Sequence, residues 1–243
     1  MSSPSDQLNL PAVLDAVRIL SPLSTSLDHG EEHWRRVATN GLDLAGAADA
    51  DPLLVVLFGM FHDSMRFGEE RDDDHGKRGG FLACCLNTEL MGLSEDRLDV
   101  LYKACAEHSD GETSEDPTIG VCWDADRLDL CRFGKEIFPG SLSTHVGRTA
   151  PARRRAMGLL TATPEWSSIF WRLSDAMRGV LPVEPDRPEP MMGERSEPEM
   201  VEAPKGPSRK RVRSEPSASG RYWTATLVKA APPATADEES PSS

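Results

Sequence analysis

The sequence predicts an all-α fold, and features of its first 180 residues support this prediction. Apolar residues recur there at intervals of three and four, the spacing that gives a helix one buried face. Prolines follow Leu10, Asp51 and Asp116, where each can open a helix without losing a hydrogen bond. No run alternates apolar and polar residues as a half-buried strand would. We therefore expect one helical domain over residues 8–180.

The first two predicted helices precede the most apolar stretch of the chain. Residues 11–20 carry a helical apolar pattern that Pro22 ends, and this helix is expected to be scaffold. The second helix would take Ser26 or Asp28 as its N-cap, because either side-chain oxygen can accept a hydrogen bond from the first turn. It would run through Ala45, with acidic residues in its first turn that complement the helix dipole.

A central helix that opens at Pro52 ends in an adjacent polar pair, His62 and Asp63. The residues before the pair are apolar on every side, so this helix should be buried all round. A buried carboxylate needs a metal ion or a tight hydrogen-bonded network, because an unpaired one costs several kcal/mol. His29 and His33 share a face of the preceding predicted helix, four residues apart. A structural His-Asp pair and a metal site are both consistent with this pattern.

A polar segment follows the central helix. Residues 67–80 are rich in charges of both signs, and this composition predicts a loop. A run of charges is usually a solvated surface. His75, Lys77 and Arg78 nevertheless follow Asp63 by only twelve to fifteen residues. This interval is short enough for the three side chains to fold back over whatever Asp63 binds.

The rest of the domain is predicted to contain helices at residues 81–90, 95–108, 118–130, 148–160 and 164–180. Ser94 caps the second of these, and His108 lies at its C-terminal end, where the helix dipole favours an imidazolium. Three aspartates, Asp124, Asp126 and Asp129, interleave with core-type residues in the third. Asp126 and Asp129 share a face and Asp124 points elsewhere. Such carboxylates repel one another unless arginines or a metal ion lie near.

Composition separates a C-terminal tail from this domain. Residues 181–243 hold eleven of the nineteen prolines, are rich in Glu, Ser and Ala, and lack apolar periodicity. We expect this Pro/Glu/Ser-rich tail to be disordered, because it cannot bury enough surface to offset its ordering entropy. Most of the net charge of -13 falls on residues 1–180. An acidic body repels polyanions, so a nucleic-acid polymer is not expected as its ligand.

The five cysteines show no metal-type pairing in the sequence and fall in helical patterns, so we expect reduced core residues: Cys84, Cys85, Cys105, Cys122 and Cys131. The longest apolar run, residues 53–61, is too short to span a bilayer. The N-terminus lacks a basic region followed by an apolar one. We therefore expect a cytoplasmic protein without a membrane partner. The sequence does not predict an oligomeric state.

Three motifs taken together resemble those of the HD-domain superfamily of metal-dependent phosphohydrolases. HGEEHWRRV places His33 just before an aromatic residue, FHDSMR contains the His62-Asp63 pair, and DADRLDL contains Asp126. The joint pattern is much more specific than any one motif, and the resemblance covers about residues 20–135. It implies an HD-domain-like helical bundle and selects Asp126 as the aspartate of the last motif that completes a metal site.

This resemblance implies one divalent metal held by His33, His62, Asp63 and Asp126, with a second metal possible. Two imidazoles and two carboxylates neutralise the ion and leave positions open for water and a phosphate oxygen. Mixed nitrogen and oxygen ligation suits Mn, Fe, Co, Ni, Mg or Zn and does not choose among them. His29 and Asp129 are expected to support these ligands from outside.

The expected activity is hydrolysis of a small phosphorylated compound, a nucleotide or a phosphomonoester, by a metal-activated water. The residues expected to take part in catalysis are Asp63, His75, Lys77 and His108, and those expected to neutralise the substrate phosphate are Arg36, Arg66, Lys77 and Arg127. Two alternatives stay open. Six ordered ligands, His33, His62, Asp63, His75, His108 and Asp126, would suit a binuclear iron oxygenase. The second alternative is a catalytically silent module that binds a nucleotide or a protein partner.

Overall fold

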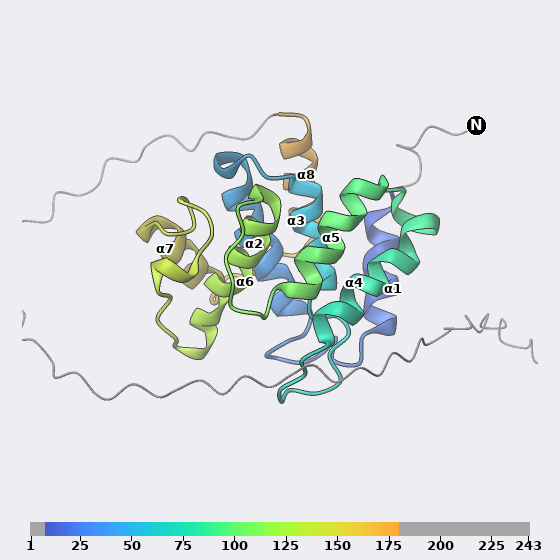
Figure 1. Ribbon diagram of the computed structural model, residues 1–243, viewed down its shortest axis with the longest axis horizontal. Coiled ribbons are helices and arrows are strands. Elements are labelled where there is room, and N and C mark those ends of the chain that lie inside the picture. Colours follow the sequence, from blue (N-terminus) through green and yellow to red (C-terminus); the bar gives the residue numbers. More distant parts are fainter. Residues whose placement is uncertain (1–7, 180–243) are drawn as a thin grey trace, which may run out of the picture. The chain divides into compact units, whose positions relative to one another are not determined.

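A computed structural model describes residues 8–179, and the predicted disordered tail lies outside the described residues. The helices are α1 (Leu10–Leu20), α2 (Glu31–Ala48), α3 (Pro52–Phe61), α4 (His75–Leu86), α5 (Glu95–Glu107), α6 (Pro117–Asp129), α7 (Ala150–Leu159) and α8 (Trp166–Met177), shown in Figure 1. A π-helical segment (Asn87–Met91) extends α4, and short 3-10 turns follow α6. Within residues 8–179 no strand occurs, which confirms the all-α class.

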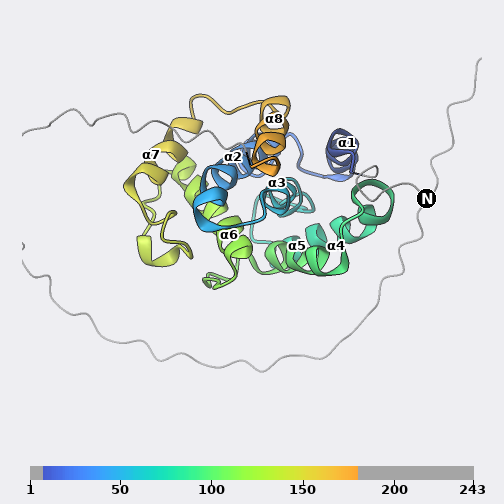
Figure 2. The same ribbon diagram turned by 90° about the horizontal axis from the view of Figure 1, so that it is seen from above.

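Helix α3 occupies the centre of this arrangement. It lies between α2 and α8 on one side and α4 and α5 on the other (Figure 2). Every residue from Leu53 to Phe61 is buried, as the continuous apolar run predicts. The carboxylate of Asp51 caps the helix by accepting from the amides of Leu53 (3.0 Å) and Leu54 (3.3 Å). His62 and Asp63 therefore emerge from the core at the end of a fully buried helix.

Helix α2 begins later than predicted. Its N-cap is Gly30, and neither Ser26 nor Asp28 caps it. The hydroxyl of Ser26 accepts instead from the amides of Asp28 and His29, both at 3.1 Å, and so closes a turn before the helix. His29 lies in this turn, so the prediction that it shares a helical face with His33 is wrong.

Helix α4 begins at His75, so the prediction of a loop over residues 67–80 is wrong for its second half. Glycines are poor helix formers, and this segment contains several. Two of them are needed for packing. A side chain at Gly76 would overlap the carbonyl oxygen of Cys105, and one at Gly79 would overlap that of Phe61. The glycines lower the intrinsic helix propensity but let α4 contact the backbone of its neighbours.

We predict that Gly79→Ala destabilises the fold by about 2 kcal/mol, because the added methyl group forces α4 away from the end of α3. Denaturant-induced unfolding followed by circular dichroism would measure this loss. The matched control is Gly68→Ala, where an added Cβ meets no atom within 4 Å. Equal stability of the two variants would contradict the close approach of α4.

The cysteines only partly follow the prediction of core residues. All five are free, and Cys105 and Cys122 are buried. Cys84 and Cys131 are half-buried, and Cys85 is exposed, so the core prediction is wrong for Cys85. None of the helices within residues 8–179 has both the length and the apolar character needed to cross a membrane.

Candidate metal centre

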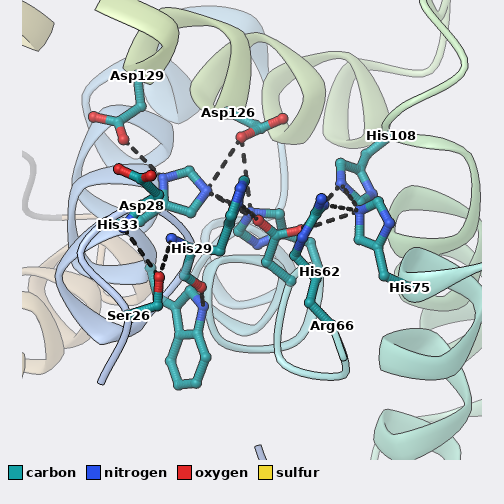
Figure 3. A network of polar contacts seen from close by, with 12 residues as sticks. Ser26, Asp28, His29, His33, His62, Arg66, His75, His108, Asp126 and Asp129 are labelled. Carbon is teal, nitrogen blue, oxygen red and sulfur yellow. Dashed lines mark hydrogen bonds and ion pairs between the residues drawn. The ribbon is translucent and has the colours of Figure 1, made fainter. Parts of the chain in front are cut away.

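Residues far apart in the sequence meet beside the end of α3 (Figure 3). His62 and Asp63 follow α3 directly, and His33 comes from α2. His75 begins α4 and His108 follows α5. Helix α6 contributes Asp126 and Asp129. The packing of α2 against α3 and α6, and of α4 against α5, brings these side chains together.

The first cluster consists of His33, His62, Asp63 and Asp126. The Nε2 atoms of the two histidines lie 3.0 Å apart. Asp63 Oδ2 lies 3.6 Å from Nε2 of His33 and 4.0 Å from that of His62. Asp126 Oδ1 lies 3.4 Å and 3.8 Å from the same two atoms. Four donor atoms thus surround one small volume, and Asp126, whose side chain is 18% exposed, is the most exposed of the four residues.

Hydrogen bonds fix how the two imidazoles of the first cluster face each other. His33 Nδ1 lies 2.7 Å from a carboxylate oxygen of Asp129, and His62 Nδ1 lies 3.0 Å from the carbonyl oxygen of Phe58. A carbonyl or an ionised carboxylate only accepts, so each Nδ1 carries a hydrogen. The lone pairs of the two Nε2 atoms then point at each other, and a proton or a metal ion must lie between them. The donor set therefore fits a divalent metal.

The second cluster consists of Asp63, His75 and His108. The Nε2 atoms of its histidines also lie 3.0 Å apart. Asp63 Oδ1 lies 3.0 Å from Nε2 of His75 and 3.6 Å from that of His108. The Nδ1 atoms bond to the carbonyl oxygens of Asp72 and Cys105, so the same tautomer follows. Asp63 thus presents one oxygen to each cluster, and each cluster includes a group that could hold a metal ion.

The electrostatics of the first cluster favour a positive charge, either a proton on an imidazole or a metal ion. Burial would raise the pKa of Asp63, but the neighbouring imidazoles outweigh it and hold this pKa well below its usual range. Burial would also raise the pKa of Asp126, but the hydrogen bond to His33 and the neighbouring imidazoles outweigh burial and lower this pKa. Burial lowers the pKa of His62 to about 3 against the opposing pull of both carboxylates. Ionised carboxylates and a neutral imidazole are the states that bind a metal ion.

Asp129 supports the first cluster from a fully buried position. Besides contacting His33, it accepts from Nε of Arg36 at 2.7 Å and from Nη1 of Arg132 at 3.2 Å. Burial raises its pKa less than His33 and Arg36 lower it, so Asp129 stays ionised. A charged acceptor on Nδ1 orients the ring and increases the basicity of Nε2. The predicted supporting role of Asp129 therefore has a direct geometric basis.

We predict that Asp129→Ala weakens metal affinity on the order of 10- to 100-fold, because His33 loses the acceptor that orients it. Isothermal titration calorimetry with Mn²⁺ would measure the change. The matched control is Asp43→Ala, which removes a partly buried α2 carboxylate paired with Arg172, away from the cluster. An affinity loss equal to that of the control would show that Asp129 has no such role.

Arg66 is the predicted phosphate ligand that contacts the clusters directly. Its Nη1 lies 3.1 Å from Nε2 of His75 and 3.4 Å from Oδ1 of Asp63. His29, predicted to support the ligands, places Nδ1 2.9 Å from Asp63 Oδ2, and its Nε2 lies 3.8 Å from the carboxylate of Glu69. Sequence reasoning missed Glu69, because it lies in a charged run that was interpreted as a solvated surface.

The other predicted phosphate ligands have protein partners. Arg36 is buried and bonds to Asp129. Arg127 donates to the carbonyl oxygens of Ser141 (2.8 Å) and Glu112. Lys77 pairs with Asp74 at 2.9 Å, and 61% of its side chain is exposed. Their roles toward a substrate stay predictions. Arg132, expected beside the three aspartates of α6 as one of the arginines that offset their charge, does pair with Asp129 at 3.2 Å.

Comparison with known proteins gives one similar solved structure. It is described as a predicted HD superfamily hydrolase from an uncultured Thermotogales bacterium and is 22% identical, with a TM-score of 0.49. The alignment covers 68% of this chain and 92% of that one. No protein-family model matches the chain, and neither does any curated protein. The buried His/Asp groups beside the end of α3 could hold a metal ion.

Proposed function

We propose that this protein is a metal-dependent phosphohydrolase that acts on a small phosphorylated compound. The observation that carries the proposal is the pair of Nε2 atoms of His33 and His62, 3.0 Å apart with both Nδ1 atoms engaged. The carboxylates of Asp63 and Asp126 flank this pair. Among ions, such a site suits one divalent metal with positions left for water and a phosphate oxygen.

The chemistry that a bound divalent ion supplies is a water of lowered pKa and a polarised phosphoryl oxygen. The side chains of the chain have separate tasks. The first cluster holds the ion, and Asp129 keeps the His33 ring in position. Arg66, whose guanidinium lies 3.4 Å from Asp63 Oδ1, can neutralise a phosphate oxygen bound beside the clusters. His75 and His108 would contact the substrate or hold a second ion.

The charge balance of the chain supports a small substrate. Residues 1–180 carry most of the net charge of -13, which repels a nucleic-acid polymer at long range. A single phosphate group avoids most of this repulsion, because a divalent ion and the guanidinium of Arg66 can neutralise it locally. A nucleotide or a phosphomonoester meets this requirement.

The test is a substrate screen with controlled metal content. We expect the chelator-treated full chain to be inactive and to regain hydrolysis of nucleotides or phosphomonoesters when Mn²⁺, Co²⁺, Ni²⁺, Mg²⁺, Zn²⁺ or Fe²⁺ is added. Released phosphate and metal content are measured on the same samples. Bound metal without turnover of any compound would overturn the hydrolase, and absence of bound metal would overturn the site itself.

One observation favours a second candidate function, a binuclear iron oxygenase. The six predicted ligands form two adjoining clusters that share Asp63. Oxygen chemistry of this kind needs a pair of redox-active ions. Anaerobic iron loading separates the two functions: the oxygenase requires about two irons per chain and a loss of iron in His108→Ala. Unchanged iron content in that variant would remove this candidate.

A further inference from the structure

The contact between Arg66 and the second cluster has a chemical consequence. His75 Nδ1 bonds to the carbonyl oxygen of Asp72, so it carries the hydrogen of the neutral ring. Nε2 then has a single lone pair. Nη1 of Arg66 lies 3.1 Å from this nitrogen and can donate into that lone pair, which also faces Nε2 of His108 at 3.0 Å. A metal ion bound to His75 would need the same lone pair.

Charge adds to this conflict. Nη1 of Arg66 also lies 3.4 Å from Asp63 Oδ1, the oxygen that faces His75 at 3.0 Å. An ion held by His75 and Asp63 would sit about 2 Å from each donor atom. The guanidinium would then lie beside a divalent cation in a buried site, where like charges repel strongly. Arg66 in its present position and a second metal ion therefore exclude each other.

The contacts of the Arg66 side chain are consistent with its moving out of the second cluster. Nη2 donates to the carbonyl oxygen of Glu70 at 3.1 Å, in the segment between α3 and α4. Within residues 8–179, its Nε is buried and has no hydrogen-bond partner. A buried N–H without a partner costs free energy in the present position. The side chain is 11% exposed, so part of it already reaches the solvent.

We propose that Arg66 and a second divalent ion compete for the lone pair of His75 Nε2, so that Arg66 controls whether the second cluster binds metal. The inference rests on the proposed metal-dependent function, since it takes the first cluster as the primary site. With Arg66 in place, the protein holds one ion. When Arg66 moves away, Asp63, His75 and His108 become free to hold another, and the guanidinium becomes available to a phosphate group.

Metal titration of matched variants tests this inference. Arg66→Gln removes the competing cation, and Arg71→Gln removes the same charge from an exposed position nearby that pairs with Asp73. Calorimetric titration with Mn²⁺, together with elemental analysis, gives the number of ions and their affinities. We expect one tight ion in the wild type and in Arg71→Gln. In Arg66→Gln a second ion should bind more tightly, on the order of 10- to 100-fold.

The double variant Arg66→Gln with His75→Ala tests whether the second ion binds at His75. We expect this double variant to bind one ion. Circular dichroism checks folding, and Arg66→Met replaces Arg66→Gln if that variant does not fold. One ion in every variant would overturn the inference and leave the proposed function standing. Two ions of equal affinity in the wild type and Arg66→Gln would also overturn it. No bound ion in the wild type would instead overturn the proposed function.

Discussion

Asp63→Asn is expected to abolish both metal binding and hydrolysis. Asp63 gives one oxygen to each cluster, at 3.6 Å from His33 Nε2 and 3.0 Å from His75 Nε2, so one substitution affects both. The amide keeps the size of the side chain but removes the negative charge that the imidazoles stabilise. A catalytic metal supplies several kcal/mol of transition-state stabilisation, so the rate should fall about 10³-fold or more.

Metal content and phosphate release, measured on the same preparation, check this result. The matched control is Asp43→Asn, an isosteric change on α2 that weakens the ion pairs of Asp43 with Arg155 and Arg172. It should keep its metal and its rate. Hydrolysis that persists at the wild-type rate in Asp63→Asn would exclude Asp63 from the site.

Asp126→Ala is expected to lose metal and activity, whereas Asp124→Ala should keep the metal. Asp126 Oδ1 lies 3.4 Å from His33 Nε2 and 3.8 Å from His62 Nε2. Asp124 is buried on another face of α6, where it accepts hydrogen bonds from the backbone of Ser143 and from the backbone and hydroxyl of Thr144. Asp124 thus ties the segment after α6 to the helix.

The two variants should therefore differ in the property they lose: stability in Asp124→Ala and metal binding in Asp126→Ala. Asp124→Ala leaves part-buried donors of Ser143 and Thr144 without their acceptor and should lower the free energy of unfolding by about 2 kcal/mol. Asp126, with 18% of its side chain exposed, should matter less to stability than to metal binding. Elemental analysis and denaturant-induced unfolding give the two quantities. If Asp124→Ala lost the metal and Asp126→Ala retained it, the ligand on α6 would be misassigned by two residues.

The elements that local signals specify could be predicted from the sequence. Asp51 and Pro52 begin α3 as expected, because capping involves only the next few residues. The burial of α3 follows from its unbroken apolar run. The start of α2 could not be predicted in the same way. Ser26 is a good N-cap residue, but its hydroxyl is used in a preceding turn, and composition does not choose between these uses.

The second cluster depends on contacts between separate helices, which local sequence patterns do not predict. The sequence predicts a loop around His75, because residues 67–80 are rich in charges of both signs. The glycines there also reduce helix propensity. Packing against α5 and the end of α3 outweighs that cost and places His75 next to His108, 33 residues away. The motif resemblance selects residues, but not which side chains meet. The contact of Arg66 with His75, rather than with solvent, is of this non-local kind.

The glycine contacts of α4 also bear on which ions suit the second cluster. Gly76 directly follows His75 and touches the backbone of Cys105 without an intervening side chain. The two imidazoles are therefore carried on segments in direct contact, with little freedom to separate. Calcium prefers six to eight oxygen ligands at about 2.3–2.6 Å, whereas zinc binds imidazole at about 2.0–2.1 Å. The backbone of α4 thus sets an upper limit on ionic radius and favours small transition-metal ions over calcium.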